Sequence, residues 1–495
     1  MGVVRKQSIL SLLATFLGFA LGAANQIWYN QYLTQEEYGL TMVFREVFVA
    51  FSYIATFGTV LTFHRFYPLY NHYLKRERND LPFLVLAAFS LGLALVATIL
   101  IAFKEPISGY FSKNSPLFVE KYYLVLPLTA TCLCTILLEA YAYMLKRTFS
   151  FNLVKEVGFR LYQTVIVFLY GYNVIDIDTF FLLFAFMYVP AIMIMAWIDF
   201  SNRGIKIVPK ISGLTRRVYK VILGFTTFHF SSTLLGVAPV AVNSLLISSI
   251  SPMGLSDSAV YLMARFFMAV LDAPLRSITG INIATISEAF HQRDYTRVGR
   301  LYQKTSINLL LVGIFFFILI YINIHNVDLF FKDKDYSYLG TLFLILGMGK
   351  LFELSMGMNG AIMYLSKHWK VDFYTSSFVI LLSIPVNYFL IKQHPLMGAV
   401  IGETSMLLLI CILRFYWVNR LLHIKPYTIK TLGLIIIGLL TLGVSHLLPT
   451  LDNLLADVAI KTIVASLVFL SAIWWYRPSD DFHELLERMV KRVKR

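Results

Sequence analysis

The stretch 259–290 reads AVYLMARFFMAVLDAPLRSITGINIATISEAF, and it decides how the rest of the chain is interpreted. It is an apolar run longer than the roughly 20 residues that an α-helix needs to cross a bilayer. Arg265, Asp272 and Arg276 interrupt it at intervals of seven and four residues, which places the three side chains on one helical face. A charge in mid-membrane is costly unless it is paired or lines a cavity. The stretch therefore predicts a membrane helix with a functional or paired polar face.

Composition places the whole chain in a membrane. Hydrophobic residues make up 58% of the 495 residues, and charged residues only 14%. No soluble domain of this size tolerates that balance on its surface. The apolar runs have helical length and lack the alternating pattern of barrel strands. We therefore expect an all-α polytopic membrane protein.

Hydropathy windows predict about fourteen transmembrane helices. Lys and Arg gather on alternate connecting segments, which places the N- and C-termini in the cytoplasm. The first span is expected to act as an uncleaved signal anchor. The net charge of +15 is then a signal of topology and not of nucleic-acid binding. The predicted spans are 8–30, 41–67, 81–103, 120–145, 153–172, 179–199, 221–250, 258–290, 304–325, 338–364, 371–391, 396–419, 430–448 and 457–476.

An internal repeat predicts the domain organisation. A shift of 220 residues aligns Arg45 with Arg265 and Glu139 with Asn359. Six spans per repeat give two lobes of the same orientation, with a substrate cavity between them near the midplane. The predicted parts are an N-terminal six-helix lobe over 1–200, a basic cytoplasmic connector over 201–220, a C-terminal six-helix lobe over 221–420, two extra transmembrane helices within 430–476, and a cytoplasmic amphipathic helix over 478–495.

Three arginines are the hardest of the intramembrane charges to explain as structural: Arg45, Arg265 and Arg276. Asp272 can balance only one of them at full strength, so positive charge is left over in the predicted membrane. A guanidinium stays charged and binds phosphate or carboxylate through two parallel hydrogen bonds. These four residues predict an anion-binding cavity, with Arg276 as the deepest arginine. The alternative is structural pairing between helices.

Other polar residues within the predicted spans carry weaker predictions. A lone polar residue in a span more often joins two helices, and two opposite charges three residues apart can simply neutralise each other. The residues assigned to a cavity or to ion coupling are Glu139, Asn25, His229, Asn243, Lys350 and Glu353. Three cations close to predicted cytoplasmic ends are interpreted as snorkelling side chains: Arg65, Lys155 and Arg414.

The sequence carries no sign of enzymatic chemistry. It has no Walker motif, no metal-ligand spacing and no external loop long enough to fold into a catalytic domain. Cys132, Cys134 and Cys411 all lie in apolar runs, where small buried cysteines are common. We expect neither a metal nor a cofactor, and the chain is not expected to be an enzyme.

Two short motifs carry a resemblance to a known family. The sequence LTQEEYG at Leu33–Gly39 follows the first predicted span, and RFYP at Arg65–Pro68 closes the second. The opening region resembles that of bacterial oligosaccharide flippases of the multidrug/oligosaccharidyl-lipid/polysaccharide exporter superfamily. The resemblance in span plan covers nearly the whole chain. It implies two six-helix lobes in a V around a central cavity.

The resemblance also implies a function. Such proteins translocate an undecaprenyl-pyrophosphate-linked sugar repeat unit to the outer face of the bacterial cytoplasmic membrane by alternating access. A pyrophosphate also suits an arginine-lined cavity, so we expect Arg265 and Arg276, with Arg45 facing them from the other lobe, to hold it. Asp272 or Glu139 is expected to compete for the arginines, which favours release and offers a place for coupling to H⁺ or Na⁺. Membrane lipids and a polysaccharide polymerase are the expected partners of a monomeric protein.

Two other functions stay open. A cation-coupled multidrug exporter has the same fold, although the first span here carries no acid to serve as a cation site. A lipid-binding or scaffolding membrane protein without transport activity is the third interpretation.

Overall fold

The computed structural model describes residues 2–145, 151–200, 205–331, 333–451, 453–479 and 482–483. Within these ranges it describes every side chain except those of residues 2–16, 199–200, 228, 231–238, 280–281 and 284. The predicted amphipathic helix over 478–495 lies largely outside the described residues, as does the start of the predicted connector at 201–204. All regular structure in the described ranges is helical.

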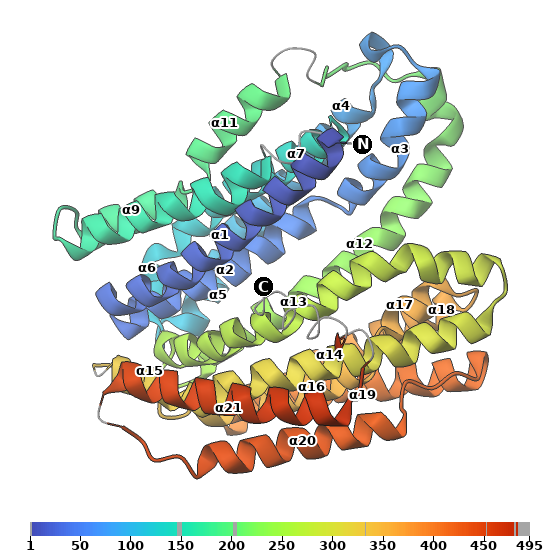
Figure 1. The fold of residues 1–495 in the computed structure, drawn as a ribbon. Helices are drawn as coiled ribbons and strands as arrows, with labels where there is room; N and C mark the ends of the chain where they lie inside the picture. Colours follow the sequence, from blue (N-terminus) through green and yellow to red (C-terminus); the bar gives the residue numbers. More distant parts are fainter. Residues whose placement is uncertain are drawn as a thin grey trace. The chain divides into compact units, whose positions relative to one another are not determined.

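The helices form two compact units, Met1–Ala259 and Val260–Arg495, whose elements are coloured along the sequence in Figure 1. The first unit holds α1 (Gly2–Tyr32), α2 (Gln35–Ala55), α3 (Thr59–Tyr73), η1 (Arg76–Arg78), α4 (Leu81–Ala102), α5 (Lys104–Phe111), α6 (Pro116–Lys121), η2 (Tyr122–Leu124), α7 (Val125–Met144), η3 (Leu153–Gly158), α9 (Phe159–Gly171), α10 (Ile177–Ala185), α11 (Val189–Phe200) and α12 (Gly213–Ile250). Helix α13 (Leu255–His291) begins in the first unit and continues in the second. The second unit also holds α14 (Tyr295–Asn323), α15 (His325–Phe330), α16 (Leu339–Ser355), α17 (Asn359–Leu365), α18 (Trp369–Gln393), α19 (Pro395–Leu422), α20 (Ile429–His446) and α21 (Leu454–Tyr476).

Each of the fourteen predicted spans coincides with one helix or with consecutive helices. Among the described residues, ten helical segments are long and apolar enough to cross a membrane. The pair α16 and α17, bent by 48°, makes an eleventh if it counts as one span. The other three predicted spans coincide with α1, with η3 followed by α9, and with α12. The fold class predicted from hydropathy is therefore confirmed.

Helix α12 packs against α2 and α3 of the first unit. Thr62 of α3 and Thr226 of α12 share a hydrogen bond of 2.8 Å, and Tyr70 and Thr215 share one of 2.7 Å. The boundary between the units therefore falls after Ala259, whereas the sequence repeat placed α12 in the C-terminal lobe. The packing of α12 on α2 and α3 places it in the first unit, and hydropathy does not reveal such contacts.

The motif at Leu33–Gly39 is the N-terminal cap of α2. The Thr34 hydroxyl accepts a hydrogen bond from the Glu37 N–H at 3.3 Å, and the Glu37 carboxylate accepts one from the Thr34 N–H at 2.8 Å. This reciprocal arrangement satisfies two otherwise unpaired donors at the helix end. At Gly39 a Cβ would lie 2.0 Å from the Leu255 carbonyl oxygen, so only glycine allows this close approach. The motif thus has a structural role.

Two predicted spans are interrupted by residues in the left-handed backbone region. Phe57 (φ 47°) and Gly58 (φ 71°) separate α2 from α3, and Gly357 (φ 58°) separates α16 from α17. A Cβ at Gly58 would lie 2.5 Å from the Phe230 backbone nitrogen of α12. The glycine therefore permits both the turn and the close packing of α3 on α12.

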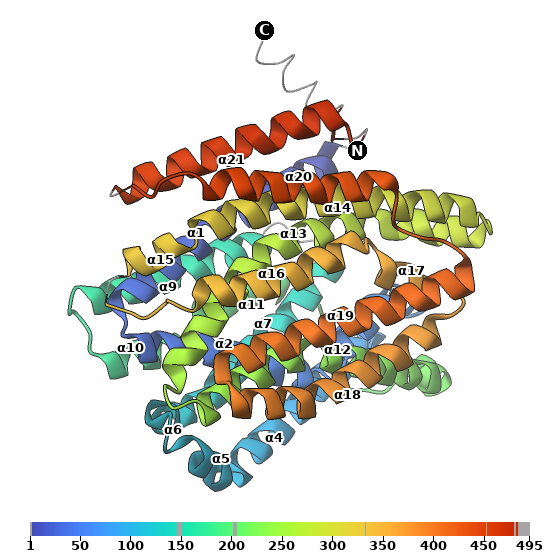
Figure 2. The ribbon, with the colours of Figure 1, turned by 90° about the horizontal axis from the view of Figure 1, so that it is seen from below.

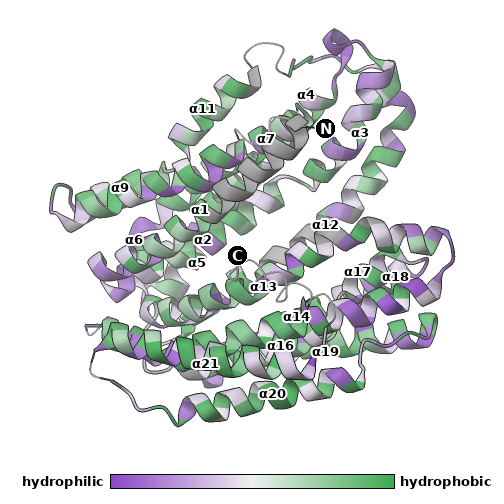
Figure 3. Ribbon diagram, in the orientation of Figure 1, coloured by the Kyte–Doolittle hydropathy of each residue, from purple (hydrophilic) through white to green (hydrophobic). Residues whose placement is uncertain are grey.

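The last two helices pack on the second unit. Figure 2 shows α20 and α21 beside each other and along α14, and all three pairs are in contact. The rings of Phe315 in α14 and Phe469 in α21 have centroids 5.5 Å apart. Hydrophobic residues predominate along α20 and α21 (Figure 3), as expected for helices with a lipid-facing side.

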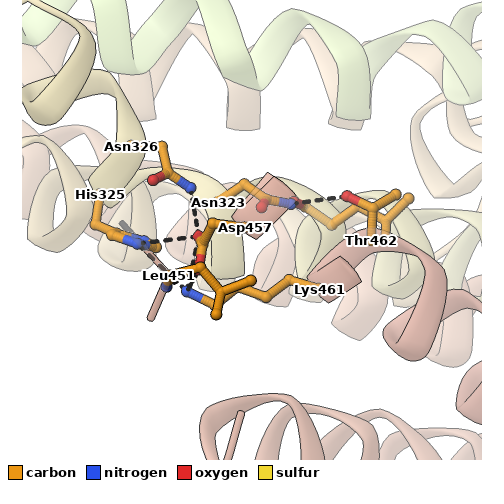
Figure 4. A network of polar contacts seen from close by, with 8 residues as sticks. Asn323, His325, Asn326, Leu451, Asp457, Lys461 and Thr462 are labelled. Carbon is orange, nitrogen blue, oxygen red and sulfur yellow. Dashed lines mark hydrogen bonds and ion pairs between the residues drawn. The ribbon is translucent and has the colours of Figure 1, made fainter. Parts of the chain in front are cut away.

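A buried polar network connects the N-terminal end of α21 to α15 and to the preceding loop (Figure 4). Asp457 is 1% exposed and accepts hydrogen bonds from Asn326 at 2.9 Å, from the Leu451 N–H at 3.0 Å and from Lys461 at 2.9 Å. His325 lies 3.5 Å from the same carboxylate. Lys461 is itself buried, so each charge depends on the other. The network ties α21 to α15 and to the loop that precedes α21.

Candidate functional site

The first charged residue on the polar face of α13 pairs with an acid of another helix. The spacing of charges along α13 does not predict this partner. Arg265 forms an ion pair with Glu403 of α19. The Tyr261 hydroxyl, one helical turn earlier, donates to the other Glu403 oxygen at 2.7 Å. Glu403 thus receives two donors from one face of α13. Its side chain is only 17% exposed, so the pair holds α13 against α19.

Two turns further along, Asp272 lies in a cluster with α16. It pairs with Lys350, which also pairs with Glu353 three residues later. Arg276 approaches Asp272 at 3.6 Å, a longer contact than the pair with lysine. The Arg276 side chain is 76% exposed, against 11% for Lys350. Lys350 is therefore the structural counterion of the cluster, and Arg276 is its accessible cation.

A third ion pair joins α18 and α19. The Arg414 guanidinium donates to Asp372 at 2.8 Å and to the Ser376 hydroxyl at 3.1 Å. Arg414, which was predicted to snorkel to the membrane surface, is thus paired within the protein. Its partner lies in a neighbouring helix.

These ion pairs give partners to four cations within the predicted spans of the second unit. Arg265, Arg276, Lys350 and Arg414 pair with Asp272, Glu353, Asp372 and Glu403. Less positive charge is therefore left over near Asp272 than the sequence indicates, because Arg265 pairs with Glu403. Glu403 was visible as an acid in a span, but nothing in its spacing links it to α13.

In the first unit, Arg45 lies on α2 with its neighbour Glu46 at 3.5 Å. The Arg45 side chain is 38% exposed, so the guanidinium keeps donors available. Arg45 and Arg265 belong to different units, so the expectation that they face each other stays a prediction.

The first unit contains a cluster of its own around Glu139 of α7. Lys155 of η3 lies 2.7 and 2.9 Å from its two carboxylate oxygens, and the Tyr143 hydroxyl donates to it at 3.0 Å. Lys155, which was predicted to snorkel, thus pairs with an acid in the preceding predicted span.

Of the three uncharged candidates, Asn25 joins two helices. Asn25 of α1 donates to the Arg160 carbonyl at 2.8 Å and accepts from Thr164 at 2.7 Å, which joins α1 to α9. His229 of α12 lies 4.2 Å from Phe225 between ring centroids. Asn243 is 1% exposed within α12.

The third predicted snorkelling residue, Arg65, lies over the Phe225 ring at 4.3 Å. Across the described part of the chain no carboxylate lies within ion-pair distance of it. A search of the same residues for three or more metal-binding side chains in one place finds none.

Comparison with known proteins shows the fold at low sequence identity. No family model and no curated protein matches the sequence. A structure of the lipid II flippase MurJ in an inward closed conformation matches with a TM-score of 0.75 at 15% identity, over 95% of this chain and 99% of that one. An inward-facing multidrug resistance MATE-family transporter of the MOP superfamily matches with a TM-score of 0.58 at 15% identity, over 84% and 98%. A MOP-superfamily transporter from Pyrococcus furiosus gives 0.54 at 12% identity, over 85% and 95%. The chain therefore has the polytopic helical fold that MurJ and these MOP-superfamily transporters share.

Proposed function

We propose that this chain is a flippase that moves a polyprenyl-pyrophosphate-linked oligosaccharide across the bacterial cytoplasmic membrane by alternating access, for surface polysaccharide biosynthesis. The observation that carries the proposal is the likeness to the lipid II flippase over 95% of the chain, since that protein also moves a lipid. The likeness to the multidrug transporter has a lower TM-score and covers 84% of the chain.

The geometry of α13 assigns different roles to its two arginines. Arg265 is engaged by Glu403, so we assign it to positioning α13. Arg276 is largely exposed, and within the described residues its carboxylate contact, at 3.6 Å, is with Asp272, which also pairs with Lys350. Its guanidinium therefore has donors for two pyrophosphate oxygens. In this proposal Asp272 competes with the ligand for Arg276, which favours release and offers a place for coupling to H⁺ or Na⁺.

The test is complementation of a bacterial strain that lacks its own oligosaccharide flippase. Wild-type chain restores surface polysaccharide on gels, Arg276→Ala lowers it at least tenfold, and Arg276→Lys retains part of it because one charge remains. Arg300→Ala, an exposed arginine in the second turn of α14, serves as the matched control and is expected to complement fully. Full complementation by Arg276→Ala at normal protein levels contradicts the assignment of Arg276.

A cation-coupled multidrug exporter is the second candidate, supported by the likeness to MATE-family transporters. The same strains separate the two functions. An exporter raises the minimum inhibitory concentration of cationic drugs and leaves the surface polysaccharide absent. A flippase does the reverse.

A further inference from the structure

The cluster around Glu139 in the first unit has a chemistry unlike that of the arginines. Its charged pair, Glu139 and Lys155, is neutral overall, and Tyr143 donates to the same carboxylate. The Lys155 side chain is 40% exposed and that of Glu139 is 19% exposed. Ionised groups within a span face the protein interior or water, because lipid contact would be costly. The exposed side of this pair therefore faces an aqueous space.

Aromatic side chains from three further segments lie around the pair. Tyr53 is 38% exposed on α2, which packs against the α7 helix that carries Glu139, and it interacts electrostatically with Glu139 and Lys155. The ring of Tyr188, just before α11, lies 6.0 Å from that of Phe48 of α2, and Tyr188 interacts electrostatically with Tyr53. It stacks on Phe159 of α9, with ring centroids 4.6 Å apart and planes 9° apart. We call these six residues the Glu139 cluster: Tyr53, Glu139, Tyr143, Lys155, Phe159 and Tyr188.

The backbone that carries Lys155 is unusual. Leu153–Gly158 forms a π-helical turn between the end of α7 and α9. Such turns are rare, and they occur frequently at functional sites because the wider turn redirects side chains. This turn is packed against α1 and α11, so it is held in place by its neighbours. The position of Lys155 against Glu139 is therefore a built feature of the first unit.

Carboxylate, ammonium and phenol groups beside aromatic rings suit a sugar. The carboxylate accepts hydrogen bonds from hydroxyls, the ammonium donates them, and phenols do both. Aromatic rings cover the apolar face of a pyranose, as they do the apolar parts of other small ligands. A phosphate would gain little here, because Glu139 already neutralises Lys155.

We propose that the Glu139 cluster is a saccharide-binding subsite for a sugar of the lipid-linked headgroup, an inference that rests on the proposed flippase function. Its place relative to Arg45 fits this role. Tyr53 follows Arg45 by eight residues on α2, a rise of about 12 Å. Arg45 is also within electrostatic range of Tyr188. Arg45 is one of the three arginines expected from the sequence to contact the pyrophosphate, and at that contact the attached sugars lie within reach of the cluster.

Binding to full-length protein in lipid nanodiscs tests the subsite with two probes. One is polyprenyl pyrophosphate, and the other is the same lipid carrying a single N-acetylglucosamine. We expect the wild type to bind the sugar-bearing lipid about tenfold more tightly, the size of one or two good ring contacts. Tyr53→Ala and Tyr188→Ala bring the ratio of the two affinities close to one and leave the affinity for the bare lipid unchanged. Tyr110→Ala, an exposed tyrosine of α5, is the matched control and keeps the ratio.

A charge swap separates binding from folding. Glu139→Lys combined with Lys155→Glu restores the ion pair, so thermal stability returns toward the wild-type value. The affinity ratio stays near one, because the acceptor and donor have changed places. Equal binding of the two lipids by the wild type, or an unchanged ratio in both tyrosine variants, overturns the subsite. If neither lipid binds and a cationic drug does, the proposed flippase function is what fails.

Discussion

Arg265 shows how an intramembrane charge acquires its partner from another helix. Its partner Glu403 lies 138 residues away in the sequence, and Tyr261 adds a second donor to the same carboxylate. Removing one member of such a pair leaves the other without its counterion in a poorly hydrated site. The cost is tempered here, because the two side chains are 30% and 17% exposed.

Glu403→Gln is therefore expected to destabilise the protein by about 1–3 kcal/mol, less than the 3–5 kcal/mol of a fully buried pair. Adding Arg265→Met to it should cost little more, since the cation is then also gone. Thermal unfolding of the purified single and double variants in detergent measures this coupling. Glu105→Gln, an exposed acid of α5, is the control. Strictly additive effects of the two substitutions would show that the pair contributes nothing.

At the scale of single residues, the sequence shows which helices carry charged side chains, but it does not show which residues those side chains contact. Asp272 was expected to pair with an arginine of α13, but its nearer partner is Lys350 of α16, which also pairs with Glu353. Spacing along one helix predicts which side chains share a face. It carries no information on which neighbouring helix meets that face. Glu403 and Tyr261 were missed for this reason.

Among the elements, the break between α2 and α3 offers a matched pair of glycines. Gly58 has a φ of 71°, and a Cβ there would lie 2.5 Å from the Phe230 backbone nitrogen. Gly224, in the neighbouring helix α12, has nothing within 4 Å of the corresponding position. Gly58→Ala is expected to lower stability by about 1–3 kcal/mol through strain. Gly224→Ala should be neutral or stabilising by up to about 1 kcal/mol, because alanine favours a helix.

Thermal unfolding of the two glycine variants shows whether close packing or helix propensity determines their stability. Equal shifts of the unfolding midpoint in both variants would contradict the close approach at Gly58. If Gly58→Ala but not Gly224→Ala loses polysaccharide complementation at normal protein levels, the shape of the break between α2 and α3 is needed for transport.

The attachment of α21 predicts a second effect at this scale. Asp457→Ala leaves the buried Lys461 without its carboxylate, and we expect a loss of about 3–5 kcal/mol. Asp457→Ala with Lys461→Met should recover part of that loss, because no charge is then left unpaired. Limited proteolysis in the loop before α21 reports detachment of the helix, with exposed Asp333→Ala as the control. Unchanged cleavage of the single variant would mean that packing on α14 alone holds α21.

Hydropathy predicted the positions of the helices, but it did not predict where the helices break or change their winding. All fourteen predicted spans coincide with helices, because an apolar run of that length has few alternatives in a bilayer. The breaks at Gly58 and Gly357 and the π-helical turn at Leu153–Gly158 were not predicted. They depend on close contacts with other helices, and those contacts leave no period in the sequence.

For the whole molecule, the positive-inside pattern makes a prediction about topology. In a chain whose three cysteines are replaced by serine, Asp335→Cys lies in a predicted external loop and Lys425→Cys in a predicted cytoplasmic one. A membrane-impermeant maleimide added to intact cells should label the first and not the second, while both label after the membrane is opened. Labelling of Lys425→Cys in intact cells would invert the predicted orientation.

The central claim concerns the whole molecule, namely that it carries a sugar-bearing lipid from one leaflet to the other. The most direct measurement uses vesicles that contain the purified protein and polyprenyl-pyrophosphate-linked N-acetylglucosamine, with galactosyltransferase and labelled UDP-galactose added outside. With the wild type, with or without an applied H⁺ or Na⁺ gradient, labelling should proceed from the outer-leaflet half of the lipid to nearly all of it. Protein-free vesicles and Arg276→Ala should stop near one half. A wild-type protein that is folded and inserted, yet stops at one half under every gradient, would contradict the account.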